Sequence, residues 1–396
     1  MVFLPNRQKV HSLTGRITPE LMLAAFHAVK RNRGAAGVDK VSIQMFAANL
    51  DANLNSLMSD LKDGSFQPKP LRRKFIDKGQ GKLRPLGIPA VRDRVGQEVL
   101  RRLLAPVFEP KFHDASYGFR PGRNCHKAIE QVIQYHEQGD WFVLDADIQG
   151  FFDNLSHDVI MEAVAAEVAD GNILRLIEKF LRSGVMDNGV FKPTTVGTPQ
   201  GGVISPLLAN IVLNHLDWRL HQHGRRFVRY ADDFVVVAPS KTQAEEARTQ
   251  VEQVLGELGL TLSPDKTHIT TYGKGYSFLG FVISSRSRRI RPKSEKKFQD
   301  KVRELTQRYH NFDAAVIVKL NQVIRGTAHY FCTRWATHGK TMRHLDSWIR
   351  MRLRAMWKKV KRKTDNYRLP TEQFAQLGLL SLTSYMLAIK EGRSGT

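Results

Sequence analysis

The tetrad Tyr230-Ala231-Asp232-Asp233 interrupts an otherwise apolar segment at residues 227–237. This pattern predicts two strands joined by an acidic turn. Two adjacent carboxylates at a hairpin tip repel each other, and the flanking strands give no reason to hold charge there. A divalent cation supplies such a reason, because Mg²⁺ prefers carboxylate oxygens and the phosphates of a substrate. The tetrad therefore predicts a metal-binding turn, and a solvated acidic turn is the alternative.

A second strand supplies the further acid that such a site needs. In-line phosphoryl transfer often uses two metal ions about 3.5–4 Å apart, which require more than one carboxylate residue. Residues 141–147 form a short, mostly apolar run that includes Asp145 and ends in Asp147, as expected of a buried strand. Asp147 is the natural partner of Asp232 and Asp233, and Asp145 is the alternative. We expect two Mg²⁺ ions here, for which Mn²⁺ can substitute.

The patterns around the tetrad predict an α+β fold. Helical spacing or helix-start signals occur at residues 154–168, 205–220 and 244–258, and residues 278–282 have the composition of a further strand. The order is strand, helix, helix, hairpin, helix and strand. It predicts an antiparallel sheet with helices on one face.

The flanks of this central region are also patterned. Residues 18–30 predict a helix capped by Thr18, and residues 67–89 predict two strands around a turn at 78–82. After Ser284 the chain becomes strongly basic and helical, so we expect a domain boundary near residue 285. In the predicted helix at 343–363, an apolar face is opposed by a basic one made of Arg350, Arg354, Lys358 and Lys361.

The charge of the whole chain points to a polyanionic partner. The 396 residues carry a formal net charge of +23. Such a charge favours nucleic acid, since binding releases counterions from the phosphate backbone. An anionic membrane is the competing partner, but no long apolar run accompanies the basic segments, so we expect no membrane association.

The two cysteines, Cys125 and Cys332, are isolated. They exclude a disulfide framework or a Cys-x-x-Cys zinc site and suit a reducing compartment. The first fifteen residues contain no apolar core of signal-peptide length. We therefore expect a cytoplasmic protein.

Eight stretches in one order give the chain a specific resemblance. It is similar to the reverse transcriptases encoded by bacterial group II introns, in a form that lacks an endonuclease domain. The resemblance implies a right-hand polymerase, with fingers and palm at residues 1–285 and a helical thumb or maturase region with a short tail at 286–396. The matching stretches are residues 32–39, 82–89, 116–123, 145–153, 197–210, 229–233, 262–267 and 278–281.

The same resemblance implies roles for individual residues. Asp147, Asp232 and Asp233 correspond to the catalytic, metal-binding triad. Phe152 lies five residues after Asp147, where the family has an aromatic gate against the ribose 2′-hydroxyl; a core phenylalanine is the alternative. The other implied nucleotide-binding residues are Lys78, Arg84, Gln200 and Lys266, of which Lys266 resembles a lysine that protonates the departing pyrophosphate.

Contacts to template and primer are implied for a further set. Arg120 and Arg123 resemble residues that contact template or stabilise the fingers, and Phe278, Leu279 and Gly280 resemble a primer grip, although a core strand would have the same sequence. The basic face Arg350, Arg354, Lys358 and Lys361 suits phosphate contacts in the thumb.

The sequence thus predicts an RNA-directed DNA polymerase that uses an RNA template, a DNA or RNA primer and dNTPs. Maturase work on an intron RNA is a second activity that can coexist with it or stand alone. An RNA polymerase shares the metal chemistry, but Phe152 argues against it. A stand-alone enzyme of host defence or DNA repair shares the same core and stays open. Target-DNA cleavage is not expected, since cysteine pairs are absent.

Overall fold

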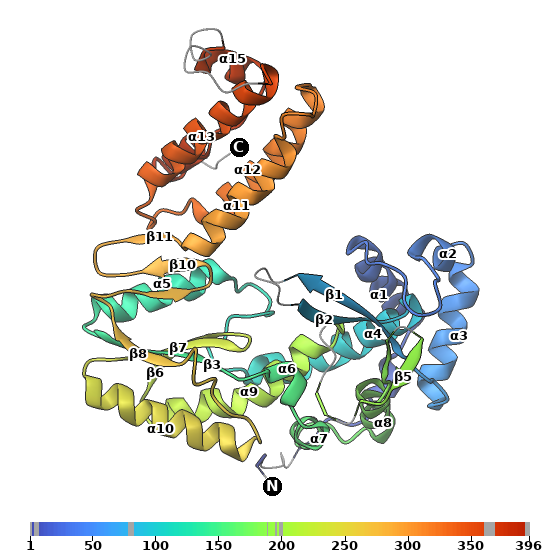
Figure 1. The fold of residues 1–396 in the computed structure, drawn as a ribbon. Helices are drawn as coiled ribbons and strands as arrows, with labels where there is room; N and C mark the ends of the chain where they lie inside the picture. The colour runs from blue at the N-terminus through green and yellow to red at the C-terminus, as the bar shows by residue number, and fades with distance from the viewer. Residues whose placement is uncertain are drawn as a thin grey trace. The chain divides into compact units, whose positions relative to one another are not determined.

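The structure is a computed structural model that describes residues 2–3, 8–77, 83–187, 189–194, 196–197, 201–359 and 369–392. The chain forms two compact units, Met1–Ile269 and Thr270–Thr396 (Figure 1). Each unit has its own hydrophobic core.

The sheet that carries the acidic turn has the strand order β6-β7-β3-β8. Its antiparallel centre pairs β7 with β6 and with β3, as the tetrad predicts. The strands are β3 (Phe142–Asp147), β6 (Arg226–Tyr230), β7 (Asp233–Ala238) and β8 (His268–Thr271).

Helices cover both faces of this sheet rather than one. Leu144, Ala146, Phe234 and Val236 point into the main core, where α9 (Ser205–Gln222) and α10 (Lys241–Glu257) pack. Figure 1 shows these two helices on one side of the strands. Part of the other face contacts α5 (Cys125–Glu137), which corrects the prediction of helices on a single face. The apolar stripe of α5, including Ile129 and Val132, explains the difference, because it needs a surface to bury against.

A second sheet has the order β2-β1-β4-β5. Its strands are β1 (Leu71–Asp77), β2 (Leu83–Ile88), β4 (Val185–Asp187) and β5 (Val190–Lys192). The predicted pair of strands around residues 78–82 is confirmed, with Asp77 opposite Leu83. The three-residue strands β4 and β5 were not predicted from sequence, because runs so short show no periodicity.

Helices complete the first unit. Thr18 caps the predicted helix α1, accepting a hydrogen bond from the Leu21 backbone N–H at 3.3 Å, and Phe26 anchors it in the core. The remaining helices are the 3₁₀ turns Thr14–Arg16 and Glu109–Lys111 and the α-helices α1 (Pro19–Arg31), α2 (Ile43–Ala47), α3 (Leu50–Asp63), α4 (Val91–Phe108), α6 (Phe151–Asn154), α7 (His157–Ala165) and α8 (Gly171–Leu181).

The second unit joins a small sheet to a helical core. The predicted strand at 278–282 is in fact two strands of this separate sheet, and β8 is the fourth strand of the first unit's sheet. The strand prediction failed because Leu279 and Gly280 both have positive φ and form a hairpin turn. The elements are β9 (Tyr276–Phe278), β10 (Phe281–Ile283), β11 (Arg288–Ile290), α11 (Pro292–Leu305), α12 (Ala314–Phe331), α13 (Gly339–Trp357), α15 (Thr371–Gln376) and α16 (Leu382–Lys390).

The sheet and helices of the second unit share contacts, which is why it begins before the expected boundary near residue 285. Phe281 packs against Phe331 and Trp335, and Ile290 belongs to the helical core. His338 completes the junction: its Nδ1 accepts a hydrogen bond from the Ile290 backbone N–H at 3.0 Å. Burial lowers the pKa of His338 to about 4.

This histidine predicts a pH-dependent stability of the second unit. The folded pKa lies below the usual 6.5, so the stabilisation is present above pH 6.5 and is lost as pH falls towards 4. We expect a loss of about 2 kcal/mol between pH 7.5 and 5, measured by hydrogen exchange of α12 and α13 peptides in a urea series. His338→Asn should remove most of this dependence, whereas the exposed His344→Asn should keep it. An unchanged pH dependence in His338→Asn would contradict the assignment.

Candidate active site

The register between β3 and β7 brings two of the three predicted acids together. Asp147 lies directly opposite Asp233, and Tyr230 on β6 is also paired with Asp233. Ala231 and Asp232 therefore form a two-residue turn beside this pair. Side chains at paired positions point to the same face, with Cβ atoms about 4.5–5.5 Å apart. Because like charges directly opposite each other destabilise a sheet, this strand end favours a bound cation.

The acids project from the face opposite the main core. Side chains alternate along a strand, so Asp147 and Asp233 point away from the face on which Ala146 and Phe234 are buried. The side chain of Asp147 is 40% exposed, whereas that of Asp145 is only 16% exposed and lies 3.8 Å from the Nε2 of His268. Since Asp145 is paired with Val235, the register favours Asp147 as the first acid.

Lys266 contacts the same site. Its Nζ lies 2.8 Å from the Asp147 carboxylate, and the Ser263 backbone N–H donates to the Asp147 carbonyl at 2.8 Å. The segment at residues 263–267 is thereby held against the end of β3. This ion pair demonstrates that the Asp147 carboxylate is accessible to a cation.

Three ligands for a metal ion are not assembled. Among the residues that the structure describes, no group of three or more His, Cys, Asp or Glu side chains could hold a metal ion. One carboxylate of the predicted set is engaged with Lys266 instead. The donor chemistry nevertheless suits Mg²⁺, because the paired Asp147 and Asp233 and the adjoining Asp232 offer hard carboxylate oxygens. These residues fit the metal in type and in strand position.

Phe152 lies beside Gly197, one of the glycines that precede α9. Phe151 is buried in the core, whereas Phe152 is half-buried with its ring edge-on to Phe151 at 5.1 Å. A Cβ at Gly197 would lie 2.8 Å from the carbonyl oxygen of Phe152, so only glycine lets the loop pass so close. Similarly, a Cβ at Gly201 would lie 2.6 Å from the Gly87 carbonyl oxygen on β2. Gly197 therefore lies against the backbone of the predicted gate, and Gly201 lies against the strand that contains Arg84.

Residues that were not predicted from sequence hold the acidic turn from the core side of the sheet. Ala231 has φ 59°, a left-handed backbone that costs an L-residue about 1–2 kcal/mol. Arg229, which is fully buried, donates from Nη1 to the Ala231 carbonyl at 2.9 Å and forms an ion pair with the equally buried Asp217. Gly118 lies against the turn, since a Cβ there would be 2.4 Å from the Ala231 nitrogen. The sequence did contain one signal for this pair: Arg229 and Asp217 carry opposite charges and each interrupts an apolar run.

Comparisons with known proteins agree with this geometry. Residues 76–283, more than half of the chain, match the family described as reverse transcriptase (RNA-dependent DNA polymerase). The chain belongs to the reverse transcriptase family. Residues 295–372 match the maturase-specific domain of group II introns. The fold class is the right-hand polymerase predicted from sequence, an α+β fold with the β6-β7-β3-β8 sheet.

Relatives support the same assignment. Protein YkfC of Escherichia coli is 38% identical over 312 residues, covering 68% of this chain and 82% of that protein. The group II intron-encoded protein LtrA of Lactococcus lactis is 30% identical over 377 residues, covering 78% of this chain and 61% of its own length. Among solved structures, telomerase from Candida albicans matches with a TM-score of only 0.46 at 13% identity, covering 86% of this chain and 69% of that chain, so the assignment rests on the two relatives and not on this match.

The nucleotide-binding residues expected of this reverse transcriptase are only partly described. Lys78 and Gln200 lie outside the described residues, as does the side chain of Arg84, whose backbone is paired with Ile76 in the β1–β2 hairpin. For these three residues the assigned roles stay predictions.

The two arginines of the 116–123 segment have different surroundings. Arg120 is buried, and its guanidinium donates to the Glu109 carboxylate at 2.8 Å and to the carbonyls of His113 and Ser116. Of the two roles left open for it, these contacts favour stabilising the protein over binding template.

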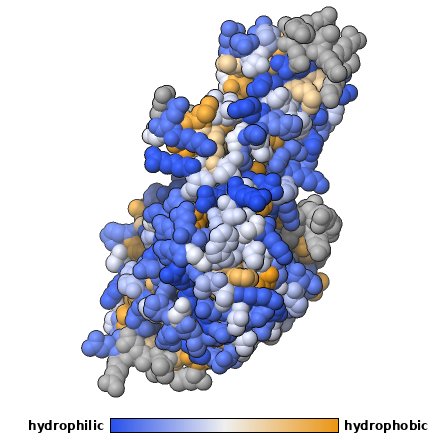
Figure 2. Space-filling model, turned by 90° about the vertical axis from the view of Figure 1, so that its left-hand side faces the viewer, coloured by the Kyte–Doolittle hydropathy of each residue, from blue (hydrophilic) through white to orange (hydrophobic). Residues whose placement is uncertain are grey.

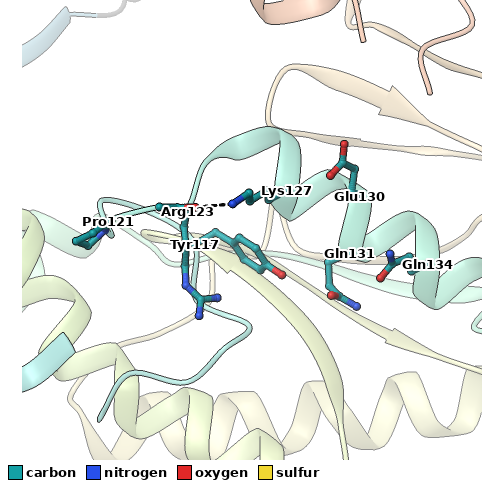
Figure 3. Close-up of a pocket in the computed structure, with 8 residues that line it drawn as sticks. Tyr117, Pro121, Arg123, Lys127, Glu130, Gln131 and Gln134 are labelled. Atoms are coloured by element: carbon teal, nitrogen blue, oxygen red, sulfur yellow. Dashed lines mark hydrogen bonds between the residues drawn. The ribbon is translucent and has the colours of Figure 1, made fainter. Parts of the chain in front are cut away.

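Arg123 lines a cavity of about 490 Å³ on the surface of the first unit (Figure 3). Its guanidinium lies 5.4 Å from the Tyr117 ring and is paired with Asp114 at 2.6 Å. Lys127 and Gln131 of α5 line the same cavity, which gives it a polar, partly basic wall. The role of Arg123 in template binding remains a prediction, and this cavity is where it would act.

The predicted primer grip and basic thumb face belong to the second unit. Phe278 is buried, and the Leu279–Gly280 turn is fixed by the Tyr330 hydroxyl, which donates to the Leu279 carbonyl at 2.9 Å. Leu279 and Gly280 are half-buried at the hairpin tip. Of this set, the tip residues rather than Phe278 are accessible to a primer.

Members of the basic thumb face differ in how they are used. Lys358 is exposed over the Trp357 ring at 3.8 Å, and Arg350 is half-buried. Arg354 donates to the Leu369 carbonyl at 2.8 Å and packs over Phe374, so it contributes to the fold of the unit. Lys361 lies outside the described residues.

Proposed function

We propose that this reverse transcriptase extends a DNA or RNA primer on an RNA template, with Asp147, Asp232 and Asp233 holding two Mg²⁺ ions. The observation that carries the proposal is the register that sets Asp147 opposite Asp233 at the acidic turn. When bound, the ions would activate the primer 3′-hydroxyl and stabilise the leaving oxygen. The negative charge of the carboxylates and the positive charge of the ions offset each other, so the acids and the ions are needed together.

Lys266 has a second role in this proposal. Its ammonium pairs with the Asp147 carboxylate, at an Nζ–oxygen distance of 2.8 Å. If Asp147 serves as a metal ligand, Lys266 would no longer pair with it. The freed Nζ could then donate a proton to the departing pyrophosphate, as a general acid requires. Lys78 and Arg84 would contact the triphosphate through charge-assisted hydrogen bonds. Gln200 would pack near the incoming nucleotide.

The net charge and surface of the protein support nucleic acid as its partner. The chain carries a net charge of +23, and the face in Figure 2 is largely hydrophilic with small, separate apolar patches. Within the described parts of the chain, no helix is both long and apolar enough to cross a membrane.

Asp232→Ala tests the polymerase proposal. Removing one carboxylate from the metal site should lower primer extension on an RNA template by at least about 1,000-fold, a loss comparable to that of a catalytic group. Template–primer affinity should remain near the wild-type value. The matched control is Asp153→Ala, an exposed acid on α6 near Gly197, which should retain activity. Equal synthesis by wild type and Asp232→Ala would rule the proposal out.

Phe152→Ala tests the choice of DNA as product. If the ring excludes the 2′-hydroxyl, its loss should raise ribonucleotide incorporation relative to deoxynucleotide incorporation by about tenfold or more, since one steric contact is worth about 1–3 kcal/mol. The comparison is the ratio of kcat/KM for the two nucleotides. The neighbouring Phe151→Leu should lower stability without changing that ratio, because Phe151 is in the core. An unchanged ratio in Phe152→Ala would rule out Phe152 as the gate. Efficient ribonucleotide use by the wild type would favour an RNA polymerase.

We also propose that the second unit binds intron RNA, as a maturase does. This rests on the match of residues 295–372 and on the similarity to LtrA, whose name describes a group II intron-encoded protein. The half-buried Arg350 on α13 and the exposed Lys358, which directly follows this helix, are suitable phosphate contacts.

The variant Arg350→Gln/Lys358→Gln tests this RNA contact. It should weaken binding of a group II intron RNA and reduce the slope of log K against log salt by about 1–2, since each phosphate contact releases counterions. Its primer extension on a short template should change far less than its intron binding. Lys301→Gln on α11, whose partner is Glu304, is the control. Wild-type intron affinity and salt slope in the double variant would contradict the proposal.

A further inference from the structure

Arg229 is a fully buried charge whose every N–H group has an acceptor. An arginine side chain has five N–H donors. Nε and Nη2 donate to the two carboxylate oxygens of Asp217 at 2.7 and 2.5 Å, and Nη2 also donates to the Ser116 hydroxyl at 2.9 Å. Nη1 donates to the Asn210 side-chain oxygen at 3.0 Å and to the Ala231 carbonyl at 2.9 Å. Only the last of these bonds reaches the acidic turn.

The acceptors come from elements that are themselves fixed. Asn210 and Asp217 lie seven residues apart on α9, so two helical turns bring them to the same face. Asn210 also donates to the Gly118 carbonyl at 2.8 Å, and Gly118 lies against the backbone of Ala231. The Arg229 backbone pairs on both sides of Ser116, through the Ala115 carbonyl and the Tyr117 N–H. The guanidinium is thus held rigidly before it contacts the turn.

Fold stability alone does not explain such a network. A buried ion pair is often no more stable than apolar residues of similar volume, because both charges lose their hydration. The turn, by contrast, has a definite requirement. Ala231 is in a left-handed conformation that alanine disfavours, and the bond from Arg229 is directed at its carbonyl. Strained backbone at a functional site persists only where the surroundings impose it.

We infer that Arg229, clamped by Asp217, is the positioning residue of the acidic turn: it locks Ala231 so that Asp232 and Asp233 meet the metal ions together with Asp147. The inference rests on the proposed two-metal function. Arg229 itself contacts no substrate. It acts from the core side of the sheet, because its side chain points to α9 while the acids point to the opposite face.

Two variants separate positioning from folding. Arg229→Met/Asp217→Met removes both charges together, so no unpaired charge is left in the core. Arg229→Lys keeps a charge for Asp217 but has only three donors on one atom, too few for the five bonds. The control Arg226→Met/Asp140→Met removes a different ion pair of Arg226, which lies on the same strand as Arg229, with 3.1 Å between its Nη1 and the Asp140 carboxylate. This pair does not contact the turn.

Three readouts are needed on the full chain: thermal melting, primer extension under single-turnover conditions, and backbone cleavage by Fe²⁺ and ascorbate without nucleic acid. We expect both Arg229 variants to melt near the wild type and to extend primers about 100-fold more slowly, with the KM for dNTP little changed. Iron-dependent cleavage near residue 232 should disappear in them and persist in the control. Asp232→Ala should lose both activity and cleavage.

The outcomes separate this inference from the proposed function. Activity in Asp232→Ala would defeat the two-metal proposal and the inference with it. Inactive Asp232→Ala with near wild-type extension in a folded Arg229 variant would defeat only the inference. Should the double variant fail to fold, Arg229→Lys decides. Failure of both to fold would also overturn the inference, since the pair would then serve the fold.

Discussion

The antiparallel register of β3 against β7 is the constraint on which the rest of this structure depends. It sets Asp147 opposite Asp233 and leaves Asp232 in the turn next to them. A shift by one residue would turn Asp147 into the core and expose Ala146 or Leu144, because side chains alternate along a strand. The apolar residues that fix the register are therefore also the residues that fix the acids. The pattern that folds the sheet thus also places the proposed metal ligands.

The two faces of the sheet have different roles. Its core face packs on α9 and α10 and holds the buried Arg229–Asp217 pair. Its other face presents the carboxylates, with Asp147 still open enough to bind Lys266. Helix α9 serves both tasks, since the glycine-rich loop precedes it and Asn210 and Asp217 support the turn from its side.

Much of the fold was predictable because its signals are local. The tetrad, the strand ending at Asp147, the Thr18 cap and the β1–β2 hairpin each depend on a few neighbouring residues, and the structure contains all of them. The resemblance to intron-encoded reverse transcriptases predicted the family, and the family matches and the relatives confirm it.

The features that could not be predicted from sequence depend on long-range pairing. The strand assigned at 278–282 contains a turn, because Leu279 and Gly280 take positive φ, and β8 replaces it in the palm. Arg120 has the same residue type as Arg123 but a buried guanidinium, which only its contacts with Glu109 and His113 reveal. The Arg229–Asp217 pair joins residues twelve positions apart on two elements. Each charge interrupts an apolar run, but the sequence does not show that the two side chains meet.

The central claim is that Asp147, Asp232 and Asp233 jointly bind the catalytic metal ions. Its most direct test is a crystal structure with template–primer, a non-hydrolysable dNTP and Mn²⁺, in which anomalous scattering locates the metal. We expect two peaks about 3.5–4 Å apart, in contact with these three carboxylates, with Lys266 released from Asp147. Metal bound away from Asp147 and Asp233, or Lys266 still paired with Asp147 beside a bound nucleotide, would contradict joint metal binding by the three aspartates.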